Sequence, residues 1–462
     1  MLKKQFLSFL VTVILIGSIF SGCGTGSDTP NSPAAENQES SSTEAETPIA
    51  SSMEPIILRM WGGVPPESGP QATIDLFNET FADRGIQAEY ERFVNDDTGN
   101  LKLETSLMAG NDVDLYMSYG ISQLQQRASG NMALDLTDLI ARDGFDMFGT
   151  FSSMAEAYYI DGRPYSLPTK LDQYGIVLNK TMFDAAGIPI PSSWTVDEFR
   201  EVAKQLTHGE GQDKVYGMFW NSQQEIGYVF GYISVQTLGG SPFYKAGGLE
   251  ANINDPVNIR AVSLVNDMMN VDGSSPTHTD SVTQKLSQEA MFLTGKSAMT
   301  IGPWMVRSIK DKEQFPHDFE TAFAPYPTAG DKNFTQGGYG DHLCLNPKSQ
   351  NIDAAWELAK WYAQEGMLPV VAGGRVPSAN TYNPDDVVSA FLSGAEDHID
   401  AESAKNILII PATNYAVPAY SNKLPEIDKK VNEELEAIFT GQKTVEEALN
   451  AANDFANQQL AG

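Results

Sequence analysis

The spacing of apolar and polar residues predicts strands that alternate with helices from residue 56 onward. The run IILRMW at 56–61 is apolar almost throughout, as in a buried strand, and Gly62-Gly63 ends it. Apolar residues three and four apart indicate helices, and alternation indicates strands. The next elements are expected at 69–83 (helix), 86–90 (strand), 101–109 (helix) and 113–117 (strand). This order indicates an α/β lobe with a largely parallel sheet.

The same patterns continue through the rest of the chain. Thr195 and Glu198 form a capping box, which predicts the start of an amphipathic helix. A second, aromatic-rich α/β series is expected between 215 and 286, with a strand at 215–219 that ends just before Trp220. A further amphipathic helix is expected at 352–364.

The stretch MFLTGKSAMTIGPW at 291–304 combines a helix end, a short strand and a rigid loop. Gly295 suits the left-handed position after a helix, and Gly302-Pro303 stops the strand at 298–301. Trp304 follows directly, and open α/β sheets bind ligands beyond their strand ends. Two interpretations of Trp304 stay open at this point: a core side chain, as for most tryptophans, or one that faces a ligand.

Composition and charge narrow the class of protein. The 462 residues are too many for one typical domain and suit two or three. With 30 Lys and Arg against 60 Asp and Glu, the net charge is −30. This balance argues against nucleic acid and anionic lipid surfaces as partners, because both require a basic face. The sequence has no glycine-rich phosphate motif, no zinc spacing and no calcium loop, so we expect neither a cofactor nor a metal.

The N-terminus has the pattern of a bacterial lipoprotein signal. Lys3 and Lys4 precede an apolar stretch at 6–20, and small residues lead to Cys23. The alternative, a membrane-spanning anchor, needs roughly 20 apolar residues, and this run is shorter. We therefore expect residues 1–22 to be removed and Cys23 to be lipidated. Residues 23–52 are rich in Ser, Thr, Glu and Pro and predict a disordered tether.

Four segments of the folded part resemble one known family. They are GKSAMTIGPW at 295–304, YYIDGRPYSLPTKLDQYGIVLNKTMFDAAGI at 158–188, MAGNDVDLYM at 108–117 and GGRVP at 373–377. The chain resembles the bacterial extracellular solute-binding protein family 1, the carbohydrate-binding lipoproteins of ABC importers, which are similar to maltose-binding protein. Val113 and Leu178 depart from the usual Pro and Tyr. The resemblance covers almost all of residues 56–462.

The resemblance implies a two-lobed α/β fold of the type II periplasmic-binding-protein kind, whose lobes are joined by crossing hinge strands. The N-terminal lobe is expected at 53–170 and 302–338, and the C-terminal lobe at 171–301 and 339–462. Crossings are expected at about 170–174, 300–302 and 337–341, and paired C-terminal helices at 427–439 and 445–460. The implied function is capture of a sugar or oligosaccharide between the lobes and delivery to ABC permease subunits. The protein would be a monomer without catalytic residues, lipid-anchored outside the cytoplasm on the bacterial cell membrane.

Two arguments select the residues expected to contact the ligand. Aromatic side chains just beyond strand ends can stack on sugar rings, and polar side chains on crossing strands or neighbouring loops can bind hydroxyl groups. The expected ligand-binding residues are Trp61, Tyr119, Asp172, Gln173, Trp220, Trp304, Asp341, His342 and Arg375. No catalytic residue is expected among them.

Two other classes of protein stay open on the sequence. A surface glycan-degrading enzyme would need a pair of carboxylates about 5–10 Å apart at the site. The adjacent acids Asp96-Asp97 and Asp385-Asp386 are more typical of solvated turns. A surface binding or sensor lipoprotein without a transport role would look the same in sequence. The identity of the solute also stays open, including whether it is a sugar.

Overall fold

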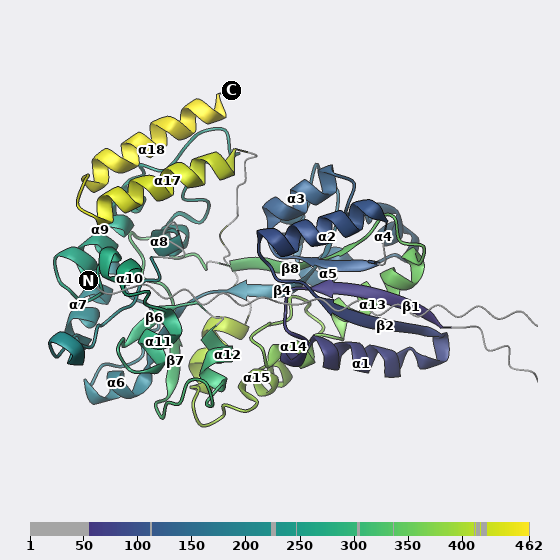
Figure 1. Cartoon of the computed structure of the whole chain (residues 1–462), viewed down its shortest axis with the longest axis horizontal. Coiled ribbons are helices and arrows are strands. Elements are labelled where there is room, and N and C mark those ends of the chain that lie inside the picture. The colour runs from purple at the N-terminus through teal and green to yellow at the C-terminus, as the bar shows by residue number, and fades with distance from the viewer. Residues whose placement is uncertain are drawn as a thin grey trace, which may run out of the picture. The chain divides into compact units, whose positions relative to one another are not determined.

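The computed structural model describes residues 55–110, 113–222, 228–245, 247–302, 305–335, 337–410, 412, 416 and 423–461. Their strands are β1 (Ile56–Gly62), β2 (Ile86–Arg92), β3 (Leu115–Ser118), β4 (Leu167–Gln173), β5 (Ile176–Asn179), β6 (Met299–Ile301), β7 (Thr321–Ala324) and β8 (Gly337–Leu345). They form a five-stranded sheet of order β2-β1-β3-β8-β4 and a three-stranded sheet of order β6-β5-β7 (Figure 1). Pairs among β1, β2 and β3 are parallel, and every other pair is antiparallel.

Helices surround both sheets. They are α1 (Pro70–Thr80), α2 (Asp97–Ala109), α3 (Ile121–Ser129), α4 (Thr137–Asp143), α5 (Met147–Phe151), α6 (Lys180–Ala185), α7 (Val196–Leu206), α8 (Tyr228–Leu238), α9 (Pro256–Asn270), α10 (His278–Thr283), α11 (Gln288–Leu293), α12 (Met305–Lys310), α13 (Ile352–Gln364), α14 (Leu368–Val371), α15 (Pro384–Leu392), α16 (Ala401–Ala404), α17 (Leu424–Phe439) and α18 (Val445–Leu460). A π-helix, η5 (Lys405–Ile409), continues α16. Among the described residues, none of these helices is long and apolar enough to cross a membrane.

Local sequence signals explain several of these boundaries. Thr195 and Thr444 each begin a helix with a complete capping box, in which Glu198 and Glu447 bind back to the cap. The predicted helices at 352–364 and 445–460 are confirmed residue for residue. In α1 the predicted apolar spacing buries Ile74 and Phe77.

Two hydrophobic cores lie on the two faces of the three-stranded sheet. Side chains alternate along a strand, so β5 sends Ile176 and Leu178 to the second core and Val177 to the first. β7 does the same with Phe323 in the first core and its alanines in the second. The first core also contains the buried side chains of the five-stranded sheet. The second core contains buried side chains of α7, α9, α17 and α18. In Figure 1, α17 and α18 pack side by side next to α9.

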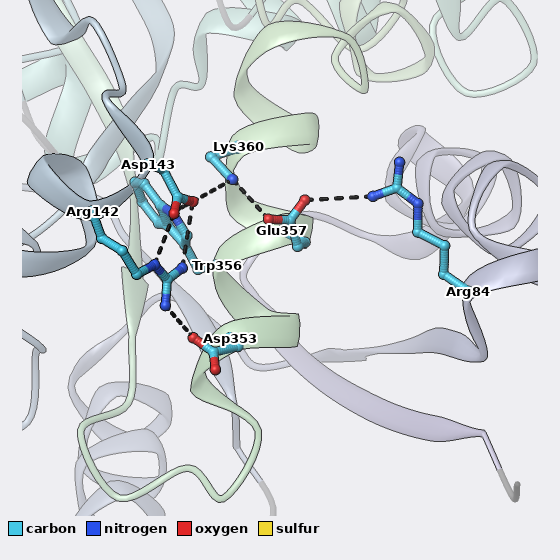
Figure 2. A network of polar contacts seen from close by, with 7 residues as sticks. All are labelled: Arg84, Arg142, Asp143, Asp353, Trp356, Glu357 and Lys360. Atoms are coloured by element: carbon cyan, nitrogen blue, oxygen red, sulfur yellow. Dashed lines mark hydrogen bonds and ion pairs between the residues drawn. The ribbon is translucent and has the colours of Figure 1, made fainter.

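A network of polar contacts fixes α13 to its neighbours (Figure 2). The Asp143 carboxylate at the end of α4 accepts hydrogen bonds from Arg142, from Trp356 Nε1 at 2.8 Å and from Lys360 Nζ at 2.7 Å. The hydrogen bonds from Arg142 and Lys360 hold the pKa of Asp143 well below its usual range. Glu357 joins Lys360 to Arg84, which lies just before β2. These contacts fix α13 to the end of α4 and to the segment before β2.

Two expectations about the second half differ from the structure. The segment 215–219 makes only single bridges, Tyr216 to Ser297 and Phe219 to Thr300, and is not a strand. Residues 339–410 were expected with the C-terminal lobe, but β8 lies between β3 and β4, and α13 to η5 pack in the first core. Among the segments after 339, α17 and α18 are the ones that join the second core.

The chain passes between the two sheets at two places, from β4 to β5 at Tyr174-Gly175 and from β7 to β8 after Ala324. Between β6 and α12 it also moves from the second core to the first, before it returns to the three-stranded sheet at β7. A side chain at Gly175 would meet the Ala324 carbonyl oxygen at 2.6 Å and Ile407 at 2.6 Å. Glycine therefore allows the two passages between the sheets to lie close together.

Candidate functional site

The carboxyl ends of three parallel strands meet at one edge of the five-stranded sheet. Gly62 at the end of β1 lies opposite Arg92 at the end of β2. β3 ends at Ser118, and its antiparallel partner in β8 is His342, so Tyr119 and Asp341 follow at the same level. Open α/β sheets bind ligands at such an edge, because the loops that leave the strands converge there.

The loop after β1 is held to this edge by two tyrosines. The Tyr90 hydroxyl donates to the Val64 carbonyl oxygen at 2.8 Å, and the Tyr119 hydroxyl accepts from the Gly63 N–H at 2.5 Å. A Cβ at Gly62 would lie 2.5 Å from the Tyr90 hydroxyl, so only glycine allows this approach. Burial, and then the charge of Asp341, raise the pKa of Tyr119 well above its ordinary value. Its hydroxyl therefore stays protonated.

An ion pair joins β8 to the loop after α14. Arg375 Nε lies 2.7 Å from Asp341 Oδ2, and the two side chains are 18% and 10% exposed. Burial lowers the pKa of Arg375, but the charge and hydrogen bond of Asp341 together with Tyr119 and Tyr362 outweigh it and raise the pKa above its ordinary value. Asp341 adopts a φ of 48°, in the left-handed region that Asp and Asn tolerate better than other side chains. The carboxylate thus holds the guanidinium at the sheet edge.

Arg307 lies close enough to this pair to feel its charge, and Arg92 acts electrostatically on Arg307 and on Tyr90. Partial desolvation, then the like charges of Arg375 and Arg92, lower the pKa of Arg307 in α12. Tyr90 responds to the charges of Arg375, Asp341 and Arg92. We call Arg92, Arg307, Arg375 and Asp341 the arginine cluster. Tyr90 and Tyr119 adjoin it.

A second polar and aromatic group follows the crossing from β4 to β5. Asp172 pairs with Lys170 on the same strand. Tyr174 stacks on Tyr232 with ring centroids 5.7 Å apart, and Tyr232 stacks on Tyr326 at 5.0 Å. This aromatic row connects the crossing to α8 and to the loop after β7.

Gln173 is fully engaged by the backbone. Its Nε2 donates to the Ile410 carbonyl oxygen at 2.7 Å, and its Oε1 accepts from the Ala412 N–H at 2.8 Å. The side chain thus fixes the segment after η5 to β4. It does not lie with the arginine cluster.

The tryptophans selected from the sequence have different surroundings. Trp61 is 6% exposed in the first core, with the Lys102 ammonium 4.7 Å from its ring. Trp220 is fully buried in the second core, with its ring 5.8 Å from that of Phe199. Trp220 therefore does not face a ligand in this structure, contrary to expectation. Trp304 lies outside the described residues, as do Pro303 and Cys23.

His342 is also a buried residue and not a surface donor. It is 1% exposed between β3 and β4, and its Nδ1 lies 3.4 Å from the Ser166 hydroxyl. Burial lowers its pKa from 6.5 to about 4. The ring therefore stays neutral at physiological pH and acts as part of the sheet.

This burial predicts an acid-dependent loss of stability. Between pH 6.5 and about 4 the unfolded chain binds a proton at His342 and the folded chain does not. Folding stability is therefore full above pH 6.5 and falls as the pH is lowered through this window, by on the order of 3 kcal/mol. Urea unfolding of wild type and His342→Gln at several pH values measures this contribution. Identical pH dependence of the two proteins would contradict it.

The structure brings together Tyr119, Asp341 and Arg375 of the predicted residues, and places Asp172 on the adjoining strand β4. The sequence analysis missed Tyr90, Arg92 and Arg307. Tyr90 and Arg92 could have been found, because Tyr90 ends a predicted strand just as Trp61 does and Arg92 follows it closely. No spacing in the sequence links Arg307 to the others. In the described part of the chain, no three His, Cys, Asp or Glu side chains gather as metal ligands would.

Comparison with known proteins identifies the class. A model of the bacterial extracellular solute-binding proteins matches residues 65–367. The chain therefore belongs to this family, as its sequence motifs predict. Two relatives, from Brucella abortus strain 2308 and Brucella suis biovar 1, have names that state a binding role and no ligand. Each is 27% identical over 286 residues, covering 58% of this chain and 65% of the relative, so the chain spans less than two thirds of these proteins.

Solved structures of similar fold include three carbohydrate-related proteins. An ABC substrate-binding protein of Listeria monocytogenes in complex with cycloalternan superposes with a TM-score of 0.69 at 20% identity, over 88% of this chain and 99% of its own. A Rhizobium etli sugar transporter in an open conformation gives 0.69 at 22%, with the same coverage. A maltose-bound T. maritima protein gives 0.64 at 19%, over 87% and 99%. These similarities confirm the predicted two-lobed α/β fold of type II solute-binding proteins.

Proposed function

We propose that this protein is the extracellular substrate-binding component of an ABC importer and captures a sugar or oligosaccharide between its lobes. The observation that carries the proposal is the cluster at the carboxyl edge of the five-stranded sheet, where Tyr119 adjoins Asp341 and Arg375. Charged and hydroxyl groups there suit the hydroxyls of a sugar, and aromatic faces suit its C–H groups. The similar folds of the cycloalternan- and maltose-bound proteins support this choice of ligand.

The protein is proposed to act by binding and not by catalysis. The family is one of binding proteins. The one carboxylate of the arginine cluster, Asp341, is committed to Arg375. Glycoside hydrolysis needs two carboxylates, one of which must exchange a proton with the glycosidic oxygen. Delivery of the bound solute to permease subunits would follow, with the protein as a monomer.

Closure of the lobes would couple binding to transport. The two passages between the sheets, with the segment after β6, would form a hinge of the kind that absorbs backbone rotation when a ligand contacts both lobes. Calorimetric titration of a panel of oligosaccharides tests the function, and solution scattering with the tightest member tests closure. Failure of every carbohydrate to bind would overturn the proposed function. An unchanged radius of gyration at saturation would overturn the hinge.

Trp304 is proposed as an aromatic contact of the ligand on its sequence context. Its position after Gly302-Pro303 and its place in the family motif both support this role. Trp304→Ala should weaken binding of the best sugar by about 2 kcal/mol or more, roughly 30-fold, as for a well-packed aromatic anchor. Titration measures the affinity, and a thermal melt of the same variant measures stability. A variant that melts far lower yet binds normally would make Trp304 a core residue.

Cys23 is proposed as the lipidated first residue of the mature protein, joined to the folded part by residues 23–52. Small residues precede Cys23, and a polar segment without large apolar side chains follows it. Cys23→Ala should therefore release the protein from the membrane fraction or leave its signal uncleaved. Fractionation and intact mass measure the two outcomes. A variant with unchanged fractionation and unchanged mass would contradict the anchor.

A further inference from the structure

The arginine cluster differs from the rest of the molecule in how its arginines pair with carboxylates. The chain has ten arginines, all of them described, and eight form an ion pair with a described carboxylate. Arg92 and Arg307 are the two that have no such partner among the described residues. Both are exposed; Arg307 feels the charges of Arg375 and Arg92, and Arg92 acts together with Arg375 on Tyr90. The two arginines without an ion pair, Arg92 and Arg307, therefore both belong to the arginine cluster.

This location is unusual for so acidic a protein. With 60 acidic against 30 basic residues, an arginine has many carboxylates available and usually finds one. At the cluster this balance is different: Asp341 is paired with Arg375, and Arg307 also feels the charges of Asp341, Arg375 and Arg92 without an ion pair of its own among the described residues. Like charges held together repel, and a bound anion would offset that repulsion. The cluster therefore favours a negatively charged ligand.

Arg375 is prepared for such a ligand. Within the described part of the chain only its Nε has a hydrogen-bond partner, which is Asp341 Oδ2 at 2.7 Å. The terminal N–H groups of the same planar guanidinium remain available, and their fork matches a carboxylate or a phosphate. Asp341 thus orients Arg375 without using the edge that would bind the anion.

We propose that the solute is an acidic carbohydrate, whose carboxylate or phosphate group is bound by Arg375 with Arg92 and Arg307 beside it. The proposal rests on the proposed sugar-binding function and specifies its ligand. Arg92 ends β2 and Arg307 lies in α12, directly after the passage from β6. An anion at the cluster would therefore contact groups from two separate segments of the chain. A local positive field in a protein of charge −30 would also guide an anionic sugar to this edge.

The test compares ligands that differ only in charge. Calorimetry of the full folded protein would use a neutral disaccharide, the matching uronic acid disaccharide and the matching sugar phosphate, at low and at physiological salt. We expect an acidic member to bind at least about tenfold more tightly than the neutral one, with affinity that falls as salt increases. The better of the two acidic members identifies the anionic group.

The variants Arg92→Gln and Arg307→Gln, singly and together, test the residues. The double variant should lose about tenfold or more in affinity for the acidic ligand and less than about twofold for the neutral one. Arg84→Gln is the matched control, because Arg84 is an exposed arginine that precedes the opposite end of β2 and pairs with Glu357. It should leave both affinities unchanged. Unchanged thermal melts show that each variant is folded.

The failures are distinguishable. Equal affinity for neutral and acidic sugars, or equal losses for both in the double variant, would overturn the acidic ligand and leave the sugar-binding function intact. Absence of binding by neutral and acidic carbohydrates alike would overturn both proposals.

Discussion

Trp220→Ala should reduce the free energy of unfolding by about 3–5 kcal/mol, the usual cost of truncating a large aromatic side chain in a core. Trp220 is fully buried and packs against Phe199 of α7, which is itself fully buried. The substitution removes the contacts of the indole and leaves a cavity that the surrounding helices fill only in part. Urea unfolding measures the loss.

Trp220→Phe is the control for shape, since it keeps a ring and most of the buried area. It should cost less than half as much, because the indole Nε1 has no hydrogen-bond partner among the described residues to lose. The affinity of the folded fraction for its ligand should change little in both variants. If Trp220→Ala kept near-normal stability but lost much of its affinity for the ligand, Trp220 would be a ligand contact and not a core residue.

The wrong expectation for Trp220 has a specific cause. The argument that an aromatic after a strand faces the ligand holds only if the strand belongs to the sheet. Residues 215–219 have the apolar pattern of a strand, yet they form single bridges beside β6, and Trp220 turns into the core. Apolar runs of this length are ambiguous from periodicity alone, and tertiary packing decides between them.

Local signals predicted local structure well. A capping box and amphipathic spacing located α7, and amphipathic spacing located α13, because those signals act within a few residues. Which core a helix joins is not a local property. The apolar face of α13 would suit either core, and its place in the first follows from the position of β8 between β3 and β4.

The candidate site could be predicted only in part for the same reason. Tyr119 and Asp341 lie near strand ends or crossings, and sequence analysis selected them on that ground. Arg92, Arg307 and Arg375 are separated by more than sixty residues at each step, and their proximity arises from sheet order and from the passage after β6. No pattern along the chain indicates that Arg307 lies near Arg375, Asp341 and Arg92 in the fold.

Asp341→Asn should destabilise the folded protein by about 3–5 kcal/mol, the cost of leaving one charge of a buried ion pair without its partner. Asp341 and Arg375 are only 10% and 18% exposed, so water cannot replace the lost carboxylate charge. Asn is the suitable replacement because it tolerates the left-handed backbone at this position and keeps the size of the side chain. Urea unfolding at neutral pH provides the measurement.

The double variant Asp341→Asn with Arg375→Met shows whether the loss comes from the unpaired charge. Arg375→Met alone leaves the Asp341 carboxylate without its partner. The two substitutions together remove both charges, so no unpaired charge remains. The double variant should therefore lose less stability than the two single variants lose in sum, and the difference, which is the coupling energy, should be at least about 1 kcal/mol. Additive losses would mean that the two side chains stabilise the fold independently. Asp341 would then contribute through the backbone of β8, and Arg375 would not depend on it for its position at the sheet edge.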